Sequence, residues 1–553
     1  MATENKKTIS WLFKMSKKQS LNMIVLILAN AFFSVLSILF AFAIKGVIDG
    51  AVNKERNRLI SYAVFILSIV VFQFIFRVLI NGLTERIRAK LEILYKSHIF
   101  SQILGKKYDK INVYHSGELM NRLTSDVSIV SEGVSTLLPS IVAAVTRLIS
   151  AVISLIILDW IFAVAFSVAG VLVFTTIAMF RGKLKGLHKR SQETDGKVRS
   201  FMQECIENLL VVKVFSVNDR VKRQAEDLQE DNFKVKMKRK NYSVIGNAIY
   251  NFIFSAGYLF ALIYGAVKIF GGVMSYGALS AVLQLVNNVQ VPFMSLSNVV
   301  PRYFSMIASA ERLMELEQIE SEHTCIDKDI KKIYSEMKGL EVDNLTFTYD
   351  RDIVLKNATA YIEKGDFVLI TGASGIGKST LMKLMLGVYP ADSGSLCIKT
   401  KSGDISLDSN TRSLFAYVPQ GNMLFSGTLK DNVTFIKDDA SEQEIERALE
   451  ISCCKEFVDS LPEGLQTIVG ENGVGLSEGQ IQRIAIARAV LCNAPIILLD
   501  EATSALDEET ERKVLDNFKK LDGVTLIIVS HKKAASTICN KLLKIKDKRI
   551  FMA

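Results

Sequence analysis

The sequence DFVLITGASGIGKSTLMKLML, residues 366–386, joins an apolar strand pattern to a helical pattern through a glycine-rich loop. The loop GASGIGKS, residues 372–379, fits the pattern G-x-x-x-x-G-K-[ST] in the strand–loop–helix setting that this pattern requires. Its backbone amides can wrap a β-phosphate, its lysine can neutralise phosphates and its hydroxyl can bind Mg²⁺. The sequence therefore predicts a nucleotide site formed by Gly372, Ser374, Gly375, Gly377, Lys378, Ser379 and Thr380, with Ser379 also a metal ligand.

The stretch APIILLDEATSALD, residues 494–507, reads as a buried strand that ends in two neighbouring acids. A carboxylate at the end of such a strand is the expected partner of the glycine-rich loop, so Asp500 is predicted to complete the Mg²⁺ site. Glu501 follows directly and points differently, which suits a general base that polarises the attacking water. The alternative is a strand followed by an acidic helix cap without a catalytic role.

Three further side chains are candidates because of where their strands end. Gln420 ends VPQ and can sense the γ-phosphate through Mg²⁺ or water, so we assign it to both the catalytic and the metal-binding residues. His531 ends IIVSH, and ligands gather at strand ends of parallel sheets, although an isolated histidine is usually structural. Tyr349, in LTFTYD, can stack on adenine or equally be an ordinary packed aromatic residue.

Strand-like runs alternate with helical patterns from Leu340 onward, as in GLEVDNLTF, DFVLIT, APIILLD and VTLIIVS. That alternation predicts an α/β domain with a largely parallel sheet over residues 340–553. The polar residues 319–339 read as a linker, and residues 1–318 form a separate region of different composition. More than one domain is also what a length of 553 residues favours.

Residues 1–318 account for most of the apolar character of the chain. The mean hydropathy is +0.27, with 49% hydrophobic and 22% charged residues, which fits a membrane part joined to a soluble part. A bilayer span needs roughly 20 apolar residues in a helix. We therefore expect an all-α domain of six spans, at residues 21–48, 59–80, 137–158, 160–180, 245–270 and 277–300, with tight turns at 159–160 and 271–277.

The two long connections, residues 81–136 and 181–244, are polar, basic and helix-forming in composition. Basic loops stay on the cytoplasmic side of a membrane, so both termini and the α/β domain are expected in the cytoplasm. We place this integral membrane protein in a bacterial plasma membrane. Membrane lipid explains the net charge of +10 more economically than nucleic acid does, so no nucleic-acid partner is expected.

The stretch LSEGQ, residues 476–480, precedes another helical pattern. Ser477 and Gln480 have the spacing of a capping box. The exposed N–H groups and the positive dipole end of the helix make its start a site for phosphate. Glu478 places an acid in the middle of that site, which needs an explanation.

The order of Tyr349, GASGIGKS, Gln420, LSEGQ, LLDE, SALD and His531 resembles that of ATP-binding cassette proteins over roughly residues 340–553. With six spans and one C-terminal cassette, the chain looks like a half-transporter of the exporter class. The resemblance implies ATP and Mg²⁺ as cofactors and two cassettes paired head to tail. Ser477, Gly479 and Gln480 of one chain would then serve the ATP held by the other. Family members often have glycine at the position of Glu478, so we expect its side chain to point away from the nucleotide.

The resemblance also implies segments that couple the two domains. Residues 116–127, SGELMNRLTSDV, and 204–219, ECIENLLVVKVFSVND, resemble the coupling segments of the exporter class. TIVGENG, residues 467–473, resembles the cassette segment that senses them, with Glu471 as its contact. Asp507 in SALD would signal between the two ATP sites.

These observations predict ATP-driven export of an amphipathic substrate, such as a lipid, drug or peptide, by alternating access in a dimer. A homodimer is favoured over a pair with a related half-transporter, because the chain carries every catalytic residue. The alternatives are a membrane-tethered regulatory ATPase, an ATP-gated channel and an importer on the same scaffold. Polar residues inside spans tend to face a cavity or another helix, and the candidates are Arg147, Asn247, Asn251, Gln284, Asn287, Asn288 and Gln290.

Overall fold

The computed structural model describes residues 2–322, 330–349, 352–421, 424–470, 473 and 475–552. The chain forms two compact units. The first contains Met1–Phe100 and Ser116–Leu316, and the second contains Ser101–His115 and Glu317–Ala553. The short segment Ser101–His115 therefore belongs with the C-terminal unit, although the sequence assigned it to the membrane domain.

The first unit consists of long helices. The polar connections are helical, as expected, because their Lys, Glu, Arg and Gln residues are good helix formers that continue each apolar span. Inside a bilayer, only a helix or a closed barrel satisfies the backbone groups. The helices are α1 (Ala2–Ser16), η1 (Lys17–Gln19), α2 (Ser20–Val52), α3 (Arg56–Leu104), α5 (Ser116–Asn121), the π-helical turn η2 (Arg122–Asp126), α6 (Val127–Leu158), α7 (Trp160–Glu207), α8 (Leu209–Val214), α9 (Asn218–Phe270) and α10 (Tyr276–Gln318).

Among the described residues, five helical segments are long and apolar enough to cross a membrane. They are Lys6–Val52, Arg56–Leu104, Ser116–Leu158, Trp160–Glu207 and Asn218–Phe270, and they contain the first five expected spans. The sixth expected span lies in α10, which is not among these five segments. Helix α10 still packs into the apolar core, where Leu285 is buried together with Phe162 of α7 and Phe254 of α9. Its crossing of the membrane stays a prediction.

Both predicted turns between spans are present. Asp159 separates α6 from α7 and accepts a hydrogen bond from the backbone N–H of Ile161 at 3.0 Å. Between α9 and α10, the buried Asp49 of α2 accepts hydrogen bonds from the Ser275 hydroxyl and the Gly277 N–H, both at 3.0 Å. A Cβ on Gly277 would lie 2.3 Å from a backbone oxygen of α2, so only glycine permits this approach.

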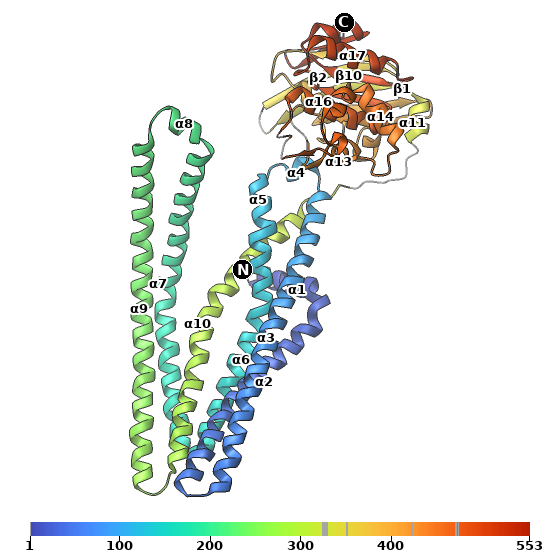
Figure 1. Ribbon diagram of the computed structural model, residues 1–553. Helices are drawn as coiled ribbons and strands as arrows, with labels where there is room; N and C mark the ends of the chain where they lie inside the picture. The colour runs from blue at the N-terminus through green and yellow to red at the C-terminus, as the bar shows by residue number, and fades with distance from the viewer. Residues whose placement is uncertain are drawn as a thin grey trace. The chain divides into compact units, whose positions relative to one another are not determined.

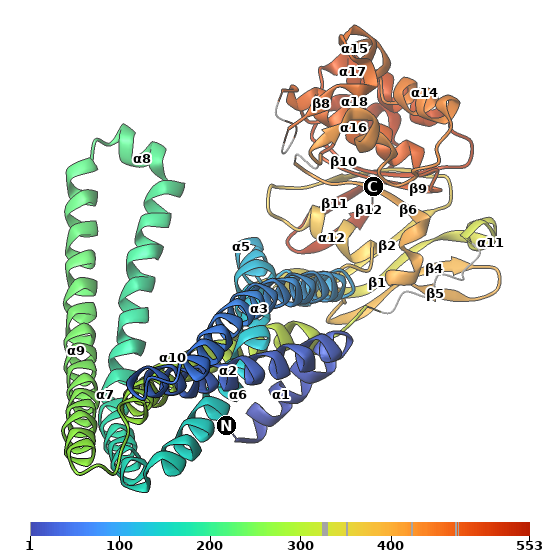
Figure 2. The same cartoon turned by 60° about the horizontal axis from the view of Figure 1, so that its bottom comes forward.

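Helices α7 and α9 run side by side and are joined at one end by the short α8 (Figures 1 and 2). Their polar halves are linked by Asp195, which accepts a hydrogen bond from Asn232 at 2.9 Å and pairs with Lys236 at 2.8 Å. At the tip, Leu210 is 77% exposed and Phe215 is 71% exposed. The α7–α9 hairpin therefore presents an apolar end.

A charged network joins the start of α6 to the end of α10. The buried Asp126 accepts hydrogen bonds from the Arg312 guanidinium, at 2.8 Å for Nε, and from the Ser309 hydroxyl at 2.9 Å. Arg122, in the same π-helical turn, pairs with Glu315 at 3.1 Å. Residues four apart lie on the same face of a helix, so both side chains reach α10.

The second unit alternates strands and helices, which confirms the predicted α/β domain. It contains α4 (Tyr108–Ile111), α11 (Ile330–Glu336), β1 (Met337–Tyr349), β2 (Asp352–Glu363), β3 (Phe367–Thr371), α12 (Lys378–Met385), β4 (Ser393–Thr400), β5 (Asp404–Ser406), η3 (Ser409–Leu414), β6 (Phe415–Val418), β7 (Gly427–Thr428), α13 (Leu429–Thr434), α14 (Glu442–Ile451), α15 (Lys455–Ser460), η4 (Gly464–Gln466), β8 (Ile468–Val469), α16 (Glu478–Leu491), β9 (Ile496–Asp500), α17 (Glu508–Lys519), β10 (Thr525–Val529), α18 (Lys533–Ile538), β11 (Lys541–Lys546) and β12 (Arg549–Met552).

Two larger sheets organise this unit. A six-stranded sheet has the order β12-β11-β3-β10-β9-β6, parallel except for β12, and an antiparallel sheet has the order β2-β1-β4-β5. Helix α12 is buried between the two sheets. Helices α14 to α18 lie beyond the opposite face of the six-stranded sheet (Figure 2).

Candidate functional site

Most of the predicted site residues lie at one edge of the six-stranded sheet. The adjacent parallel strands β3, β10, β9 and β6 lead into the glycine-rich loop, His531, Glu501 and Gln420 respectively. Because the carboxyl ends of parallel strands open at the same edge, residues spread over 160 positions of sequence meet there. The strand order therefore brings the predicted motif residues to one edge of the sheet.

The glycine-rich loop between β3 and α12 depends on its glycines. Gly375 and Gly377 have φ values of 76° and 110°, a region that other residues rarely adopt. A Cβ on Gly377 would lie 2.5 Å from the Val354 side chain, and one on Gly372 would lie 2.7 Å from the Ile545 oxygen. The loop turns tightly enough for its amides and the start of α12 to surround a phosphate. Ser374 and Thr380 lie in the same loop and in the first turn of α12.

Lys378 is the first residue of α12 and is buried. Its Nζ donates hydrogen bonds to the backbone oxygens of Gly372, at 3.0 Å, and Ala373, at 3.1 Å. The ammonium group is thus held over the loop that would enclose the phosphates. A phosphate can replace these neutral acceptors with stronger charge-assisted bonds.

Ser379 and Asp500 are in direct contact, as a shared metal site requires. The Ser379 hydroxyl donates to Asp500 Oδ1 at 3.0 Å, and the Tyr417 hydroxyl donates to Asp500 Oδ2 at 3.2 Å. Burial raises the pKa of the Asp500 carboxyl above its ordinary value, and these two hydrogen bonds oppose the rise. Tyr417 was not predicted as part of the site. Its signal in the sequence is its place on β6, the strand that leads into Gln420.

The oxygen donors of Ser379 and Asp500 fit Mg²⁺, which prefers oxygen ligands and usually completes its shell with water and substrate phosphates. Across the described ranges, no group of three or more His, Cys, Asp or Glu residues could hold a metal ion.

Glu501 and Gln420 are also in contact. Gln420 Nε2 donates a hydrogen bond to Glu501 Oε2 at 2.7 Å. Glu501 has a φ of 51°, a left-handed conformation that is uncommon for glutamate and costs of order 1–3 kcal/mol. Its backbone N–H donates to the Val529 oxygen at 3.1 Å, which fixes this turn. The backbone thus changes direction directly after Asp500, so two neighbouring acids serve different partners.

His531 lies two residues beyond β10 and is exposed. The next residue, Lys532, reaches back to the loop after β9. Its Nζ donates to the Thr503 oxygen at 3.0 Å and to the Leu506 oxygen. The sequence gave no reason to single out Lys532, because its partners lie about 27 residues earlier in the chain.

Gln482 of α16 holds the same loop from the other side. Its Nε2 donates to the Ser504 hydroxyl at 2.9 Å, and its Oε1 accepts from the Ala505 N–H at 3.0 Å. This loop leads to Asp507, whose side chain accepts a hydrogen bond from Thr510 N–H at 2.8 Å and caps α17. That backbone hydrogen bond lowers the pKa of the Asp507 carboxyl.

Tyr349 is the last residue of β1, in the antiparallel sheet. Its ring makes edge-to-face contacts with Phe347, at 4.9 Å between centroids, and with Tyr389, at 5.3 Å. Strand β2, which pairs with β1, contributes the Val354 side chain that approaches Gly377. The strand pair of Tyr349 therefore borders the glycine-rich loop, while its stacking on adenine stays a prediction.

The predicted capping box in LSEGQ is present. Ser477 Oγ accepts from the Gln480 N–H at 3.3 Å, and Gln480 Oε1 accepts from the Ser477 N–H at 2.8 Å. A cavity of about 370 Å³ opens at this helix start, lined by residues that include Ser477, Gly479 and Asp507. Its lining contains no residue of the glycine-rich loop. Within the described residues, the two predicted halves of an ATP site are thus separate places on one cassette.

Glu478 is the first residue of α16 and lines the same cavity. A carboxylate in the first turn stabilises its own helix, but it opposes a phosphate bound at the helix start. The expectation that its side chain points away from a nucleotide stays a prediction.

The substitution Glu478→Gln tests that expectation. If the carboxylate faces the cavity, removing its charge should lower the KM for ATP by about 2- to 5-fold, the effect of a charge near a helix end. The measurement is ATP hydrolysis by the chain in nanodiscs. Glu442→Gln is the matched control, because Glu442 is the exposed first residue of α14. An unchanged KM in Glu478→Gln would mean that the side chain points away.

The first cytosolic connection is divided between the two compact units. Residues 116–127 form α5 and η2 of the first unit, whereas Ser101–His115, which includes α4, packs in the second. Lys106 Nζ donates to the Glu317 oxygen at 2.8 Å, and the Tyr108 ring contacts Tyr389 at 5.8 Å. Glu471, the predicted contact for the coupling segments, lies outside the described residues.

Comparison with known proteins agrees with this geometry. Residues 20–293 match the ABC transporter transmembrane region, and residues 355–504 match the ABC transporter family model. An ATP-dependent lipid A-core flippase of Syntrophus aciditrophicus (strain SB) is 30% identical over 533 residues, covering 94% of this chain and 85% of that protein. The ATP-dependent permease MDL1 of Candida albicans is 30% identical over 482 residues, covering 84% of this chain and 68% of that protein. The structure of a bacterial Atm1-family ABC exporter with ATP bound has the same fold, with a TM-score of 0.80, 21% identity and coverage of 97% of this chain and 94% of that one.

The fold and the site therefore define an ATP-hydrolysing membrane translocase. The chain belongs to the ABC transporter family, as an exporter with a helical transmembrane domain followed by a nucleotide-binding ATPase domain. This confirms the fold class and the enzymatic activity predicted from the sequence.

Proposed function

We propose that two copies of this chain form an exporter for an amphipathic lipid with an anionic head group. Two shared sites for ATP and Mg²⁺ drive it. The observation that carries the substrate class is that two arginines in expected spans form no ion pair with a carboxylate among the residues that the structure describes. The observation that carries the dimer is the separation of the two halves of an ATP site.

The dimer is supported by the separation of two groups of predicted ATP-site residues on one cassette. Lys378 and Glu501 stand on one side of the ATP site, and the Ser477 cavity has a lining that excludes them. Exposed apolar side chains are the second support. Phe425 and Phe435 are stacked at 4.5 Å and more than half exposed on the cassette, and α8 exposes Leu210. Exposed apolar patches mark interaction surfaces, and the complete catalytic set favours an identical partner.

The substrate class is supported by Arg77 of α3 and Arg147 of α6. Both lie within expected spans, at residues 59–80 and 137–158. Arg77 also lies over the Phe33 ring at 5.7 Å. In the part of the chain that the structure describes, neither guanidinium forms an ion pair with a carboxylate. Charges in a span are costly and mark substrate pathways, so an anionic group is the missing counter-ion.

The relatives point to the same chemistry, since the first of them is named a lipid A-core flippase. A lipid also suits a transmembrane unit in which Arg147 is the most conspicuous charge of its span. The basic cytosolic connections favour a cytoplasmic cassette, and we place the protein in a bacterial plasma membrane.

The proposed cycle assigns a role to each residue of the site. Lys378 of one chain and Ser477 of the other bind the phosphates of ATP, and Gly479 and Gln480 shape the helix start that faces them. Ser379, Asp500 and Gln420 would hold Mg²⁺, which would neutralise charge on the phosphates. Closing of the cassettes would switch the spans from inward- to outward-facing. Glu501 would then polarise the attacking water, with His531 assisting, and hydrolysis would reset the spans.

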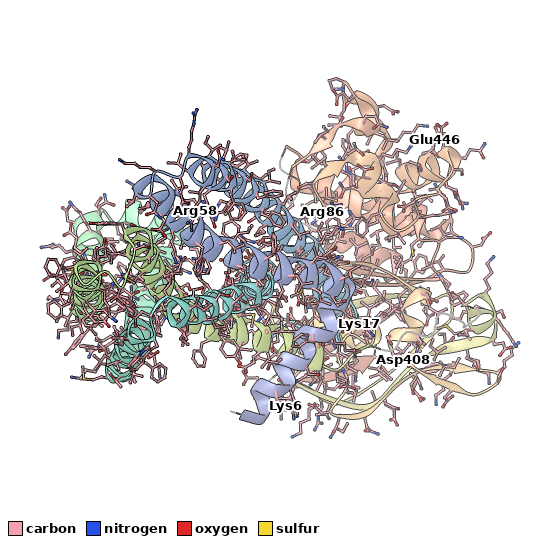
Figure 3. All side chains as sticks on the ribbon, turned by 90° about the horizontal axis from the view of Figure 1, so that it is seen from below. Lys6, Lys17, Arg58, Arg86, Asp408 and Glu446 are labelled. Atoms are coloured by element: carbon pink, nitrogen blue, oxygen red, sulfur yellow. The ribbon has the colours of Figure 1, made fainter. Side chains whose placement is uncertain are left out.

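The double substitution Arg77→Gln with Arg147→Gln tests the substrate class. In proteoliposomes, ATP-dependent flipping of fluorescent phosphatidylglycerol should fall at least about 10-fold, because hydrogen bonds to charged groups contribute roughly 1.5–3 kcal/mol each. Arg58→Gln is the control, since Arg58 (labelled in Figure 3) is exposed in the first turn of α3 and pairs with Glu55. Unchanged flipping in the double variant would contradict an anionic substrate, and no flipping by the native chain would contradict this lipid as cargo.

A further inference from the structure

A cluster of aromatic rings joins the predicted adenine platform to the first cytosolic connection. We call Tyr108, Phe347, Tyr349 and Tyr389 the aromatic cluster. Tyr389 is its centre, with edge-to-face contacts to Tyr349 at 5.3 Å and to Tyr108 at 5.8 Å, and a tilted contact to Phe347 at 5.7 Å. All four belong to the second unit, so the cluster is internal to one compact body.

Arg412 makes a second contact with the segment that carries Tyr389. Arg412 donates to the backbone oxygens of Leu386 and Gly387, each at 2.9 Å, at the end of the phosphate-binding helix α12. The same guanidinium binds the Glu322 carboxylate through two bonds of 2.7 and 2.6 Å. The Glu322 N–H donates to the Gly105 oxygen at 2.8 Å. The turn before α4 and the segment after α12 are therefore linked by polar bonds as well as by rings.

Chain continuity extends this link toward the membrane. Helix α3 runs unbroken from Arg56 to Leu104, and α4 begins at Tyr108. A displacement of α4 therefore acts directly on the end of a helix that contains an expected span. Side chains packed in a dense network have few alternative arrangements, so such contacts transmit displacement.

Tyr389 acts in this network as a neutral ring. Burial raises its pKa to about 12, and the neighbouring Tyr349 and Tyr108 hydroxyls add to the rise. The side chain keeps its proton at any physiological pH. Tyr389 therefore acts on Tyr349 and Tyr108 without carrying a charge.

We propose that Tyr389 is a positioning residue through which the adenine-binding Tyr349 and helix α4 influence each other, so that base occupancy reaches the transmembrane helices. The proposal rests on the proposed role of Tyr349 in stacking on adenine. Tyr389 itself touches neither the phosphates nor the metal site. Tyr389 sets the position of the Tyr349 ring, which would stack on the nucleotide base. It also sets the position of the Tyr108 ring, which belongs to the first cytosolic connection.

Coupling between two sites is reciprocal, which gives the proposal a quantitative test. If adenine binding is coupled to the position of α4, then removing the Tyr108 ring must change the affinity for ATP. Edge-to-face ring pairs contribute an amount that corresponds to about a 2- to 10-fold change in Kd. The effect must pass through Tyr389, so Tyr108→Leu should change the Kd for ATP in the native chain and have no effect in Tyr389→Leu.

The experiment measures the Kd for ATP of the full chain in nanodiscs, in a Glu501→Gln background that prevents turnover. The four chains are the parent, Tyr108→Leu, Tyr389→Leu and the double variant. Tyr389→Phe keeps the ring and should retain the parent Kd. Tyr361→Leu, on β2 and outside the aromatic cluster, is the matched control. Additive effects of Tyr108→Leu and Tyr389→Leu would overturn the proposal.

Hydrogen exchange on the same samples separates positioning from a merely structural role. In the parent, saturating ATP should protect the amides of residues 372–379 and also those of residues 108–112. In Tyr389→Leu the first protection should remain and the second should be lost, and Tyr389→Phe should restore it. Protection of residues 108–112 that survives Tyr389→Leu would overturn the proposal. A failure of ATP to protect residues 372–379 in the parent would instead count against the nucleotide site itself.

Discussion

Glu501→Gln is expected to reduce ATP hydrolysis by about 10²- to 10⁴-fold, the usual contribution of a general base, while leaving the affinity for ATP near that of the native chain. The reason lies in the geometry of the side chain. Glutamine has the same shape and can keep a hydrogen bond with Gln420, which Glu501 accepts at 2.7 Å. It cannot take a proton from the attacking water. The measurements are phosphate release and the Kd for ATP, on the chain alone in nanodiscs.

Glu442→Gln makes the same chemical change at an exposed helix start and should leave hydrolysis unchanged. Loss of less than about 10-fold in Glu501→Gln would move the general base elsewhere, with His531 as the first candidate. Loss of ATP binding together with hydrolysis would mean that Glu501 is needed for the strained turn after β9, where its φ is 51°. No hydrolysis by the native chain would contradict the homodimer and favour a partner with a different sequence.

The parts of this protein that sequence predicts well are those whose cause is local. The loop from Gly372 to Ser379 carries its own conformation, because its glycines are needed at positive φ. The capping box of Ser477 and Gln480 is likewise complete within four residues. The parallel sheet then brings strand ends together by a general rule, which is why Ser379 and Asp500 are in contact although 121 residues separate them.

The parts that sequence could not predict depend on partners far along the chain. Tyr417 is an unremarked strand residue until β6 pairs with β9 and brings its hydroxyl to Asp500. Lys532 stands beside the predicted His531, but its role comes from the carbonyls of a loop after β9. The sequence also gave no sign that Ser101–His115 belongs with the second unit, because this segment has no motif. The coupling role of residues 116–127 stays a prediction.

A mixture of two inactive chains is expected to regain ATP hydrolysis, if each ATP site is shared between two copies. The first chain carries Lys378→Ala, which removes the ammonium group from the glycine-rich loop. The second carries Ser477→Asp, since aspartate keeps the helix cap but places a negative charge in the cavity that would face the γ-phosphate. At about 4 Å, two like charges near a protein surface repel by roughly 4 kcal/mol, so each parent dimer should lose at least about 100-fold in hydrolysis.

Purification through two different tags isolates the mixed dimer, in which one site carries both defects and the other carries none. About half of the native hydrolysis should return, because one of the two symmetry-related sites is intact. The decisive control places both substitutions in one chain and pairs it with a native chain, since then each shared site carries one defect and the mixed dimer should be inactive. If each chain instead formed its own site, the outcome would be reversed, with the first mixed dimer inactive and the second active. Ser477→Asn caps the helix without adding charge, so it should hydrolyse ATP far better than Ser477→Asp. Equal losses in the two variants would mean that the defect comes from a damaged helix start and not from repulsion of a phosphate.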